Sequence, residues 1–578
     1  MSVGLQKRQK KKKVMKEYKK IFYKNNKIEF ILAIIVMELS ICLDIATAYI
    51  LQVVMDLATG NCTRGFKEVL ELIAVFLVVM VVFWIFSRTI KYRFYQKAIT
   101  NYKSHVFHKI SKKNMDSFLG QKTGQYISVM TNDVAVIEED YIVNLFDIIE
   151  YSSLFIGTVI VMFFYSWQML VVVFALCVLP IIVTCLCSSP ISYQEKKVSK
   201  KNEMYLCMVK DMLAGFSVIK SFKAEKEANK RFDKKNLELE QAKFKKNVFV
   251  EYLSIISEAL GCIAQISVFL FGAYLSVKGT INPGVVIAFV QLMNYILRPI
   301  ENLPVLFAKR KAAAALIEKA FDYMKDVEYE NEKEVIDASC ADIELKNVSV
   351  RYEKEDVLKD ISFKFAKGKS YAVVGTSGSG KSTLMNTLLG QMRNYDGSIK
   401  YGNTELKNIN RNSIYNLISV IQQNTFVFDD SIKENITMFG NYSENKIKHC
   451  IEKAGLSDLV REKGIGYICG ENGSNLSGGE CQRLAIARCL IKDASVLLVD
   501  EATAALDNHT SEKVMQEILK LEGITKIVVT HKLNSDEMRK YDAILVLSDG
   551  KLEECGTYEE LMEQKNIFYS LMHIKNRQ

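Results

Sequence analysis

The C-terminal part of this chain contains the glycine-rich sequence Gly375-Thr376-Ser377-Gly378-Ser379-Gly380-Lys381-Ser382-Thr383. It matches the pattern G-x-x-x-x-G-K-S/T without a gap, and it follows a short apolar run, Ser370–Val374, that predicts a buried strand. Leu384–Leu389 predicts the start of a helix. A strand, a glycine-rich loop and a helix in this order predict an α/β domain whose loop binds phosphate; the alternative is a Gly/Ser-rich turn without a ligand.

Each residue type in this loop suits phosphate chemistry. Glycines let the backbone approach a phosphate chain and present its N–H groups. Lys381 brings a positive charge to the outer phosphates, and the hydroxyl of Ser382 suits Mg²⁺. Downstream, Ser495–Val499 predicts a second buried strand that ends in Asp500 and Glu501. The first carboxylate is suited to position Mg²⁺ and the second to act as general base on a water; the alternative is a solvated acidic turn.

The order of further motifs resembles that of the ATP-binding-cassette (ABC) family. Leu476-Ser477-Gly478-Gly479-Glu480 is similar to the signature motif of that family, and Gln423 stands where the family has its Q-loop. His531, within Val529–Lys532, is similar to the switch histidine. Tyr352, on a predicted strand, matches the aromatic residue that stacks on adenine, and Ala505-Leu506-Asp507 resembles the D-loop. The resemblance covers the chain from about residue 341 to its C-terminus.

This resemblance implies a role for each motif. The signature is expected to contact the γ-phosphate of an ATP held by a second subunit. Two residues depart from the family pattern: Glu480 stands where Gln is commonest, and Ala504 stands where Ser is usual, which we expect to loosen coupling across the dimer. The expected nucleotide contacts are Tyr352, Gly375–Thr383, Gln423, Ser477, Gly478, Gly479, Glu480 and Asp507; the expected Mg²⁺ ligands are Ser382, Gln423 and Asp500; the expected catalytic residues are Glu501, His531 and Gln423.

Composition indicates a membrane part joined to a soluble part. The 578 residues are 49% hydrophobic and 25% charged, and the apolar residues concentrate before Leu306. Runs such as Ile73–Phe83 contain no charge, which argues against the alternative of buried helices in a large soluble protein. We predict six spans, at approximately Phe30–Val54, Val69–Phe86, Ile142–Tyr165, Met169–Leu186, Leu253–Val277 and Val285–Leu306.

The placement of lysine and arginine predicts that both termini are cytosolic. The first 27 residues hold eleven Lys/Arg, and the connections after the second and fourth predicted spans are also rich in them. Because these two connections have mixed charge and heptad-like apolar spacing, we predict helices that extend out of the membrane. We expect the basic N-terminal arm to lie on an anionic inner leaflet. A nucleic-acid tail is the alternative, and we expect no nucleic-acid partner.

This arrangement resembles the exporter-type membrane domain of the ABC family, in which short coupling helices dock on the cassettes. Phe118–Ser128 with Asp133 matches the usual first coupling segment, and Gly215–Phe222 with Glu225 matches the second. The alternative for each is an amphipathic helix of no special role. We expect a basic cytosolic arm at residues 1–28, an all-α transmembrane domain of six helices at 29–325, a linker at 326–341, and an α/β nucleotide-binding domain with a P-loop core and a helical subdomain at 342–578.

Ionisable side chains inside the predicted spans are candidates for substrate contact. The acidic ones are Glu38, Asp44, Asp147, Glu150 and Glu258, and the last span contains Gln291, Asn294 and Arg298. Our hypothesis is an acidic cavity that receives a cationic amphipathic substrate, such as a basic peptide or drug; a flipped lipid is the competing class. Packing between helices, or a position outside the bilayer, is the alternative for these residues.

Together these features predict an ATP-driven exporter half-transporter in a bacterial plasma membrane. The resemblance implies a second half-transporter chain, identical or different, because each ATP needs a phosphate loop from one chain and a signature from another. ATP and Mg²⁺ are the expected ligands, and the expected cargo is a peptide, an amphipathic drug or a lipid. Two other classes stay open: a regulatory or sensor protein that couples ATP to a partner without moving cargo, and an importer, which the domain order disfavours.

Overall fold

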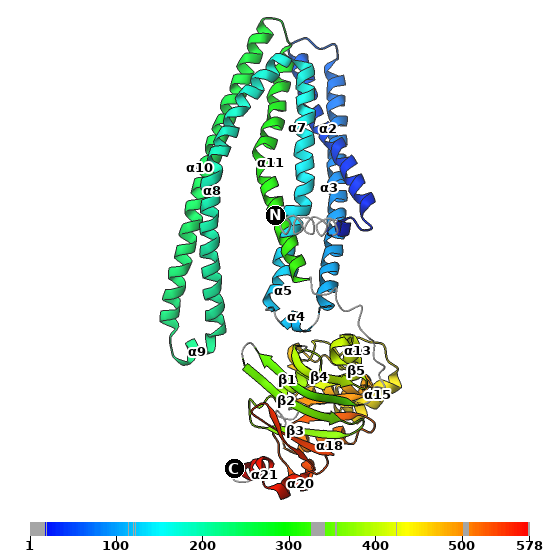
Figure 1. The fold of residues 1–578 in the computed structure, drawn as a ribbon. Helices are drawn as coiled ribbons and strands as arrows, with labels where there is room; N and C mark the ends of the chain where they lie inside the picture. Colours follow the sequence, from blue (N-terminus) through cyan, green and yellow to red (C-terminus); the bar gives the residue numbers. More distant parts are fainter. Residues whose placement is uncertain are drawn as a thin grey trace. The chain divides into compact units, whose positions relative to one another are not determined.

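The structure is a computed structural model that describes residues 18, 20–113, 115–119, 121, 123–324, 342–352, 355–392, 394–422, 425–500 and 508–575. The chain divides into two compact units (Figure 1). The first comprises residues 1–113 and 121–325, and the second comprises residues 114–120 and 326–578. The linker expected at residues 326–341 lies outside the described part of the chain.

Long helices dominate the described part of the first unit. Five of the predicted spans each lie within one of them, and the third, Ile142–Tyr165, starts two residues before its helix. The long helices are α2 (Lys27–Ala58), α3 (Phe66–Ser111), α7 (Asn144–Tyr165), α8 (Trp167–Ala214), α10 (Glu225–Val277) and α11 (Pro283–Tyr323). Among the described residues, five helical stretches have the length and composition to cross a membrane: Lys27–Ala58, Phe66–Ser111, Thr123–Tyr165, Glu225–Val277 and Pro283–Tyr323. The fourth predicted span lies in α8, where the apolar stretch Trp167–Val178 is shorter. The all-α character of the transmembrane domain is confirmed.

The apolar residues of α3 face outward instead of filling a protein core. Val75, Val78 and Val82 are 63%, 64% and 57% exposed, in the middle of an uncharged run. Water would penalise so much exposed apolar surface, whereas hydrocarbon does not. A helix also satisfies its own backbone hydrogen bonds, which a lipid environment requires. This surface of α3 therefore suits contact with lipid.

The long helices pack in two groups. α8 and α10 lie side by side, while α2, α3, α7 and α11 pack against one another (Figure 1). One apolar core of the second group contains Phe94, Tyr102 and Phe146, each at most 1% exposed. Another core, around Phe289 and Leu292 of α11, also includes residues of α8 and α10. Helix α11 thus joins the two groups.

Three of these helices continue beyond the apolar spans, as the mixed charge of the connections predicts. α3 ends at Ser111, α8 ends at Ala214 and α10 begins at Glu225. The connecting elements are α4 (Met115–Leu119), α5 (Thr123–Met130), α6 (Asn132–Ile137), the π-helix η1 (Glu138–Val143) and α9 (Phe216–Ser221). α4 and α5 overlap the first predicted coupling segment, and α9 lies within the second, between α8 and α10 (Figure 1).

The described part of the second unit contains a six-stranded and a four-stranded sheet. In spatial order, the six-stranded sheet consists of β10 (Lys551–Gly556), β9 (Ala543–Ser548), β3 (Ser370–Gly375), β8 (Thr525–Val529), β7 (Val496–Asp500) and β6 (Ile418–Ile421). The four-stranded antiparallel sheet consists of β2 (Glu355–Phe365), β1 (Ile343–Tyr352), β4 (Tyr395–Tyr401) and β5 (Thr404–Glu405). Every residue of β3 and β8 is buried, which is typical of parallel strands covered on both faces.

Helices complete the second unit and confirm its α/β class. They are α12 (Lys381–Leu388), α13 (Arg411–Leu417), α14 (Ile432–Thr437), α15 (Glu444–Lys453), α16 (Ser457–Lys463), α17 (Gly478–Ile491), α18 (Asn508–Leu519), α19 (Ser535–Met538), α20 (Tyr558–Gln564) and α21 (Ile567–Lys575). Ile436 of α14, Ile447 of α15 and Leu484 of α17 are at most 3% exposed and belong to one core. Helices α14, α15 and α17 form the predicted helical subdomain.

Strand order brings distant motifs to one edge of the six-stranded sheet. β3 pairs in parallel with β8, β8 with β7, and β7 with β6, so their carboxyl ends lie at the same edge. In open α/β sheets, ligands bind beyond the carboxyl ends of the strands. The phosphate loop follows β3, His531 follows β8, Asp500 ends β7 and Gln423 comes after β6. The sheet thereby positions the site.

Candidate functional site

The phosphate loop spans the turn from β3 to α12, and its shape requires glycine. Gly375 and Gly380 have φ angles of 153° and 99°, in the region that favours glycine. A Cβ at Gly380 would lie 2.6 Å from Cδ2 of Leu358, and one at Gly375 would collide with the carbonyl oxygen of Leu547. These positions therefore exclude a side chain on both conformational and steric grounds.

Lys381 is 6% exposed and its ammonium is held by the loop itself. Nζ donates hydrogen bonds to the carbonyl oxygens of Gly375, at 3.1 Å, and Thr376, at 2.7 Å, and it lies 3.4 Å from Oγ of Ser379. These oxygens offset the cost of burying a cation. Because carbonyl oxygens are weaker partners for an ammonium than ionised phosphate oxygens, Lys381 is ready to exchange them for a phosphate.

The loop lines a hollow of about 310 Å³ together with a histidine from another strand. His531 comes two residues after β8, the parallel neighbour of β3, and the structure places it in this hollow. The described residues that line the hollow are Val357, Ser377, Gly378, Gly380, Lys381, Ser382, Thr383 and His531. The expected phosphate-binding residues and the expected switch histidine therefore meet in one place.

The carboxylate candidates follow the next strand of the sheet. Asp500 is the last residue of β7, half-buried, and pairs with Val529 of β8, two residues before His531. Glu501, Asp507 and Ala504 lie outside the described residues, as does Gln423, which comes two residues after β6 ends. The backbone of Tyr352 ends β1, but its side chain also lies outside the described part. These five positions keep the status of predictions.

The signature motif forms the N-terminus of α17, where Ser477 and Glu480 close a capping box. The backbone N–H of Ser477 donates to Oε2 of Glu480 at 2.6 Å, its hydroxyl donates to the same oxygen at 2.9 Å, and the N–H of Glu480 approaches Oγ of Ser477 at 3.3 Å. Partial burial raises the pKa of Glu480, but these bonds, with Lys463 and Arg483 nearby, outweigh it and hold that pKa below its ordinary value. The unusual Glu480 thus stabilises the helix start.

Arg488, on the same helix, is a residue that the sequence analysis missed. Its guanidinium donates to the carbonyl oxygen of Asn435 at 2.6 Å, to Oδ1 of Asn435 at 2.6 Å and to the carbonyl oxygen of Phe426 at 2.5 Å. Asn435 is fully buried and bonds the backbone of Phe428 at 2.9 Å through both N–H and C=O. Arg488 therefore ties the signature helix to the segment after Gln423. The available signal was an arginine inside the otherwise apolar run Leu484–Leu490.

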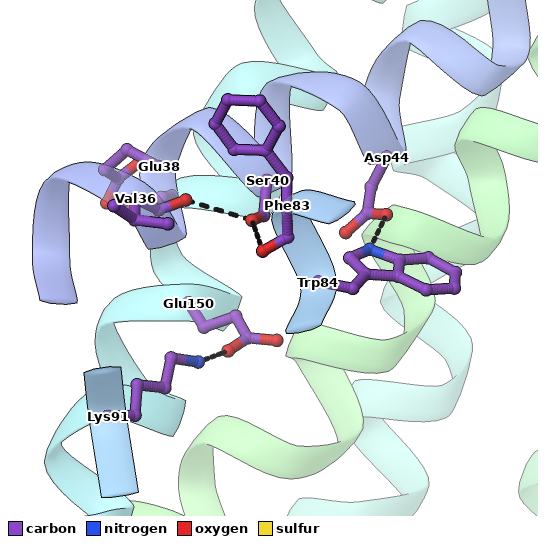
Figure 2. Close-up of polar contacts among 9 residues, drawn as sticks. Val36, Glu38, Ser40, Asp44, Phe83, Trp84, Lys91 and Glu150 are labelled. Atoms are coloured by element: carbon purple, nitrogen blue, oxygen red, sulfur yellow. Dashed lines mark hydrogen bonds and ion pairs between the residues drawn. The ribbon is translucent and has the colours of Figure 1, made fainter. Parts of the chain in front are cut away.

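The membrane-domain carboxylates lie at contacts between α2, α3 and α7, and each of three has a partner. Figure 2 shows Asp44 accepting a hydrogen bond from Nε1 of Trp84, at 3.0 Å, and Lys91 paired with Glu150 at 2.5 Å. Glu38 accepts from Oγ of Ser153 at 2.7 Å. These contacts favour the packing alternative for Glu38 and Glu150 and leave Asp44, whose carboxylate contact is exposed, as the best-placed acidic candidate.

The remaining ionisable and polar candidates are distributed over other helices. Glu258 of α10 lies 3.5 Å from Oγ of Ser254 on its own helix, in an exposed position. Nε2 of Gln291 donates to the hydroxyl of Tyr295 at 3.0 Å, one turn along α11. Asp147 is half-buried on α7, one turn before Glu150. The structure therefore groups Glu38, Asp44, Asp147 and Glu150 on neighbouring helices and places Glu258 apart from them.

Two family models match consecutive parts of the chain. The model described as ABC transporter transmembrane region matches residues 30–300, and the model described as ABC transporter matches residues 358–504. A model of the RsgA GTPase matches residues 280–429, a range that contains the phosphate loop. Because ATPases and GTPases of the P-loop class share this loop, the third match adds no separate function.

Similar known proteins include two bacterial lipid A-core flippases and a bacterial ABC exporter. An ATP-dependent lipid A-core flippase of Wigglesworthia glossinidia brevipalpis is 29% identical over 497 residues, which cover 83% of this chain and 84% of that protein. An ATP-dependent lipid A-core flippase of Escherichia coli (strain K12) is 28% identical over 486 residues, covering 82% and 83%. The solved structure of a bacterial Atm1-family ABC exporter with ATP bound has a TM-score of 0.80 at 21% identity, covering 95% of this chain and 98% of that one. This last likeness concerns the fold.

Proposed function

The chain belongs to the ABC transporter family as an ATP-driven exporter half-transporter, and we propose that it works as a dimer that moves an amphipathic substrate out of the cytosol. The observation that supports a dimer is that the phosphate loop and the signature motif, both expected to contact ATP, do not line the same hollow. The described residues that line the phosphate hollow do not include Ser477–Glu480. The signature of a second chain is therefore needed to close the site over ATP.

We infer that ATP binds to the phosphate loop of one chain and to the signature motif of the other. Lys381 exchanges the carbonyl oxygens of Gly375 and Thr376 for phosphate oxygens, while the N–H groups of the loop and of the start of α12 donate to the phosphate chain. Tyr352 stacks on adenine. Ser477 and the N–H groups of Gly478 and Gly479, from the partner chain, contact the γ-phosphate.

Mg²⁺ fits the oxygen atoms at this edge of the sheet. Ser382 and Asp500 offer a hydroxyl and a carboxylate, which are hard ligands of the kind Mg²⁺ prefers, and Gln423 adds an amide oxygen. An ideal Cβ at Gly378 meets no atom within 4 Å, and Gly378 and Ser382 line the same hollow, so there is open space on the side of Ser382. When bound, Mg²⁺ neutralises charge on the outer phosphates.

Hydrolysis follows from the residues at the ends of β7 and β8. We propose that Glu501 takes a proton from the attacking water as general base, that Gln423 orients this water, and that His531 contacts the γ-phosphate. Asp507 completes the contact with the nucleotide across the dimer. ATP closes the cassettes and hydrolysis releases them, so the transmembrane domain must have two arrangements that ATP and ADP bias differently.

We place this chain in a bacterial plasma membrane with both termini in the cytosol. The support is the excess of Lys/Arg in the N-terminal arm and in the two long connections, together with the bacterial source of the similar flippases. We propose that α4 and α9 are coupling helices that transmit cassette movement. We propose domain limits of 1–28, 29–325, 326–341 and 342–578 for the arm, the transmembrane domain, the linker and the cassette.

Two substrate classes have support. A cationic amphipath is favoured by Asp44, whose carboxylate lies at an exposed contact on α2, and by the half-buried Asp147 on the neighbouring helix α7. A lipid is favoured by the names of the similar flippases. Vesicle transport separates them: inside-out vesicles that accumulate a cationic dye with ATP support the first class, and loss of a labelled lipid from the outer leaflet of these vesicles supports the second.

Mg-ATPase of the purified chain in lipid tests the proposed function. We expect turnover from the wild type and none from Glu501→Gln, because the variant lacks the base but keeps the nucleotide contacts. Turnover that persists in Glu501→Gln would overturn the assigned base. A well-folded wild type with no turnover would show that the second chain is not an identical copy, and co-purification would then identify the different partner chain.

A further inference from the structure

A hollow of about 900 Å³ lies at the start of α2, where the chain enters the first predicted span. Its walls combine positive charge with apolar surface. The residues that line it are Lys20, Ile21, Tyr23, Lys24, Asn25, Lys27, Phe30 and Ile31. We call it the lysine hollow.

The turn that carries the lysine hollow is held firmly to α3. Asn26 is fully buried, and its Nδ2 donates to the carbonyl oxygen of Phe94 at 3.0 Å. Nδ2 of Asn101 donates to the carbonyl oxygen of Lys24 at 2.8 Å. The ring of Tyr23 packs edge-on against Phe30, with centroids 5.0 Å apart. The backbone around the three lysines is therefore fixed before any ligand arrives, so binding orders few groups.

The described residues give the lysines of this hollow no acidic partner. Among the described residues, no ion pair within 4 Å involves Lys20, Lys24 or Lys27. The nearby carboxylate of Glu29 is paired with Lys97 instead. Residues 1–16 contain further Lys/Arg and no Asp or Glu, so this stretch of sequence supplies no counter-charge. The hollow thus suits an anion from outside the chain.

An apolar stripe leads from the lysine hollow along α2. Ile28, Ile31 and Ile35 are 72%, 55% and 51% exposed, and Leu32 and Leu39 continue the same face at 45% and 47%. Their spacing of three and four residues puts them on one side of the helix. Positive charge at the end of such a stripe matches an anionic head group joined to a hydrocarbon chain.

We propose that the lysine hollow binds an anionic phospholipid of the cytosolic leaflet, with its phosphate among Lys20, Lys24 and Lys27 and an acyl chain along Ile31 and Ile35. The site is separate from the transported cargo, but it rests on the proposed cytosolic position of the N-terminus. A basic group near an anionic leaflet strengthens binding by roughly five-fold per lysine. Three lysines together give a preference for anionic over zwitterionic lipid of about ten-fold or more, after screening by salt.

Native mass spectrometry of the full-length protein tests this site with phosphatidylglycerol and phosphatidylcholine of equal acyl chains. We expect the wild type to retain phosphatidylglycerol about ten-fold better than phosphatidylcholine, and a Lys20→Gln/Lys24→Gln/Lys27→Gln variant to retain both about equally. The matched control is Lys226→Gln/Lys234→Gln/Lys245→Gln, which removes three exposed lysines of α10 and keeps the preference. Because exposed lysines contribute little to folding, both variants should unfold at the wild-type temperature.

Three outcomes would overturn the proposal. They are a wild type without preference, an equal loss in the control variant, or displacement of the lipid by inorganic phosphate at the same concentration, which would show a simple anion site. This readout needs no ATP hydrolysis, so a failure of the proposed transport function leaves it intact, and its own failure leaves the ATPase result intact.

Discussion

Leu498 in β7 and Leu77 in α3 occupy similar apolar runs, yet the first is fully buried and the second is 48% exposed. In the cassette, an apolar run is a strand covered by helices on both faces. In the membrane domain, it is a helix whose side chains project outward. An apolar run therefore predicts that its side chains leave water, but not whether protein or lipid then surrounds them.

The cassette differs from the membrane domain in a second way, because its chemistry depends on single residues. We expect Lys381→Ala to lower ATP turnover by about 10²–10³-fold, since it removes a preorganised charge at the phosphates. Steady-state Mg-ATPase in lipid measures this, with the exposed Lys359→Ala as control. A loss below ten-fold would mean that the loop backbone alone holds the phosphates. The cassette would then depend less on single residues than we expect.

The first comparison is sharpened by the same substitution in both regions. Leu498→Ala should destabilise the cassette by about 3 kcal/mol, because a close-packed core cannot refill the cavity. Leu77→Ala should cost less than about 1 kcal/mol, because fluid lipid chains fill the space. Thermal unfolding of the full chain in lipid nanodiscs compares the two. Equal costs would indicate that Leu77 packs against protein, for example against a second chain.

The membrane domain is also predicted to use carboxylates collectively. Glu38→Gln with Asp44→Asn should weaken stimulation of the ATPase by a cationic amphipath about ten-fold, or roughly 1.4 kcal/mol, and leave a neutral analogue unaffected. Glu258→Gln, at an exposed position apart from the group, serves as control. If stimulation and transport are unchanged in the double variant, the acidic-cavity hypothesis fails and the lipid class gains support.

The smallest expected effect concerns Glu480 and the acid stability of the cassette. The folded protein holds the pKa of Glu480 below its ordinary value. The ionised carboxylate therefore stabilises the folded cassette fully at pH values above the ordinary pKa, and this stabilisation is lost as the pH falls through the depressed pKa. We expect Glu480→Ala to cost about 0.5–1 kcal/mol at neutral pH and less in acid. Glu480→Gln should keep part of the cap without this pH dependence.

Urea unfolding of the wild type and both variants at neutral and acidic pH measures these differences. A Glu480→Ala cost that does not shrink in acid would show that the ionised carboxylate is not what stabilises the start of α17. The same variants also test the signature. In the wild type the hydroxyl of Ser477 donates to the carboxylate of Glu480, so it is not free to donate to the γ-phosphate. Glu480→Gln removes this negative charge, and the variant should bind ATP no more weakly than the wild type.

Sequence reasoning succeeded where a local pattern has one physical solution. The phosphate loop needed glycine at φ angles that other residues avoid, so Gly375 and Gly380 were identifiable without a structure. The long helices were predictable because an uncharged apolar run and a charged extension each favour helix. Arg488 was missed, because its three acceptors, two on Asn435 and one on Phe426, come from a segment more than 50 residues earlier in the chain.

Sequence alone determined the class of this protein: the phosphate loop, the strand ending in Asp500 and the apolar spans depend on the backbone and on side-chain periodicity, which are local properties. Three contacts became known from the three-dimensional structure: His531 shares a hollow with Lys381, Lys91 pairs with Glu150, and Lys20, Lys24 and Lys27 line one hollow at the start of α2. Such contacts depend on strand order and helix packing. These result from many weak interactions between distant residues, so no single position in the sequence predicts them.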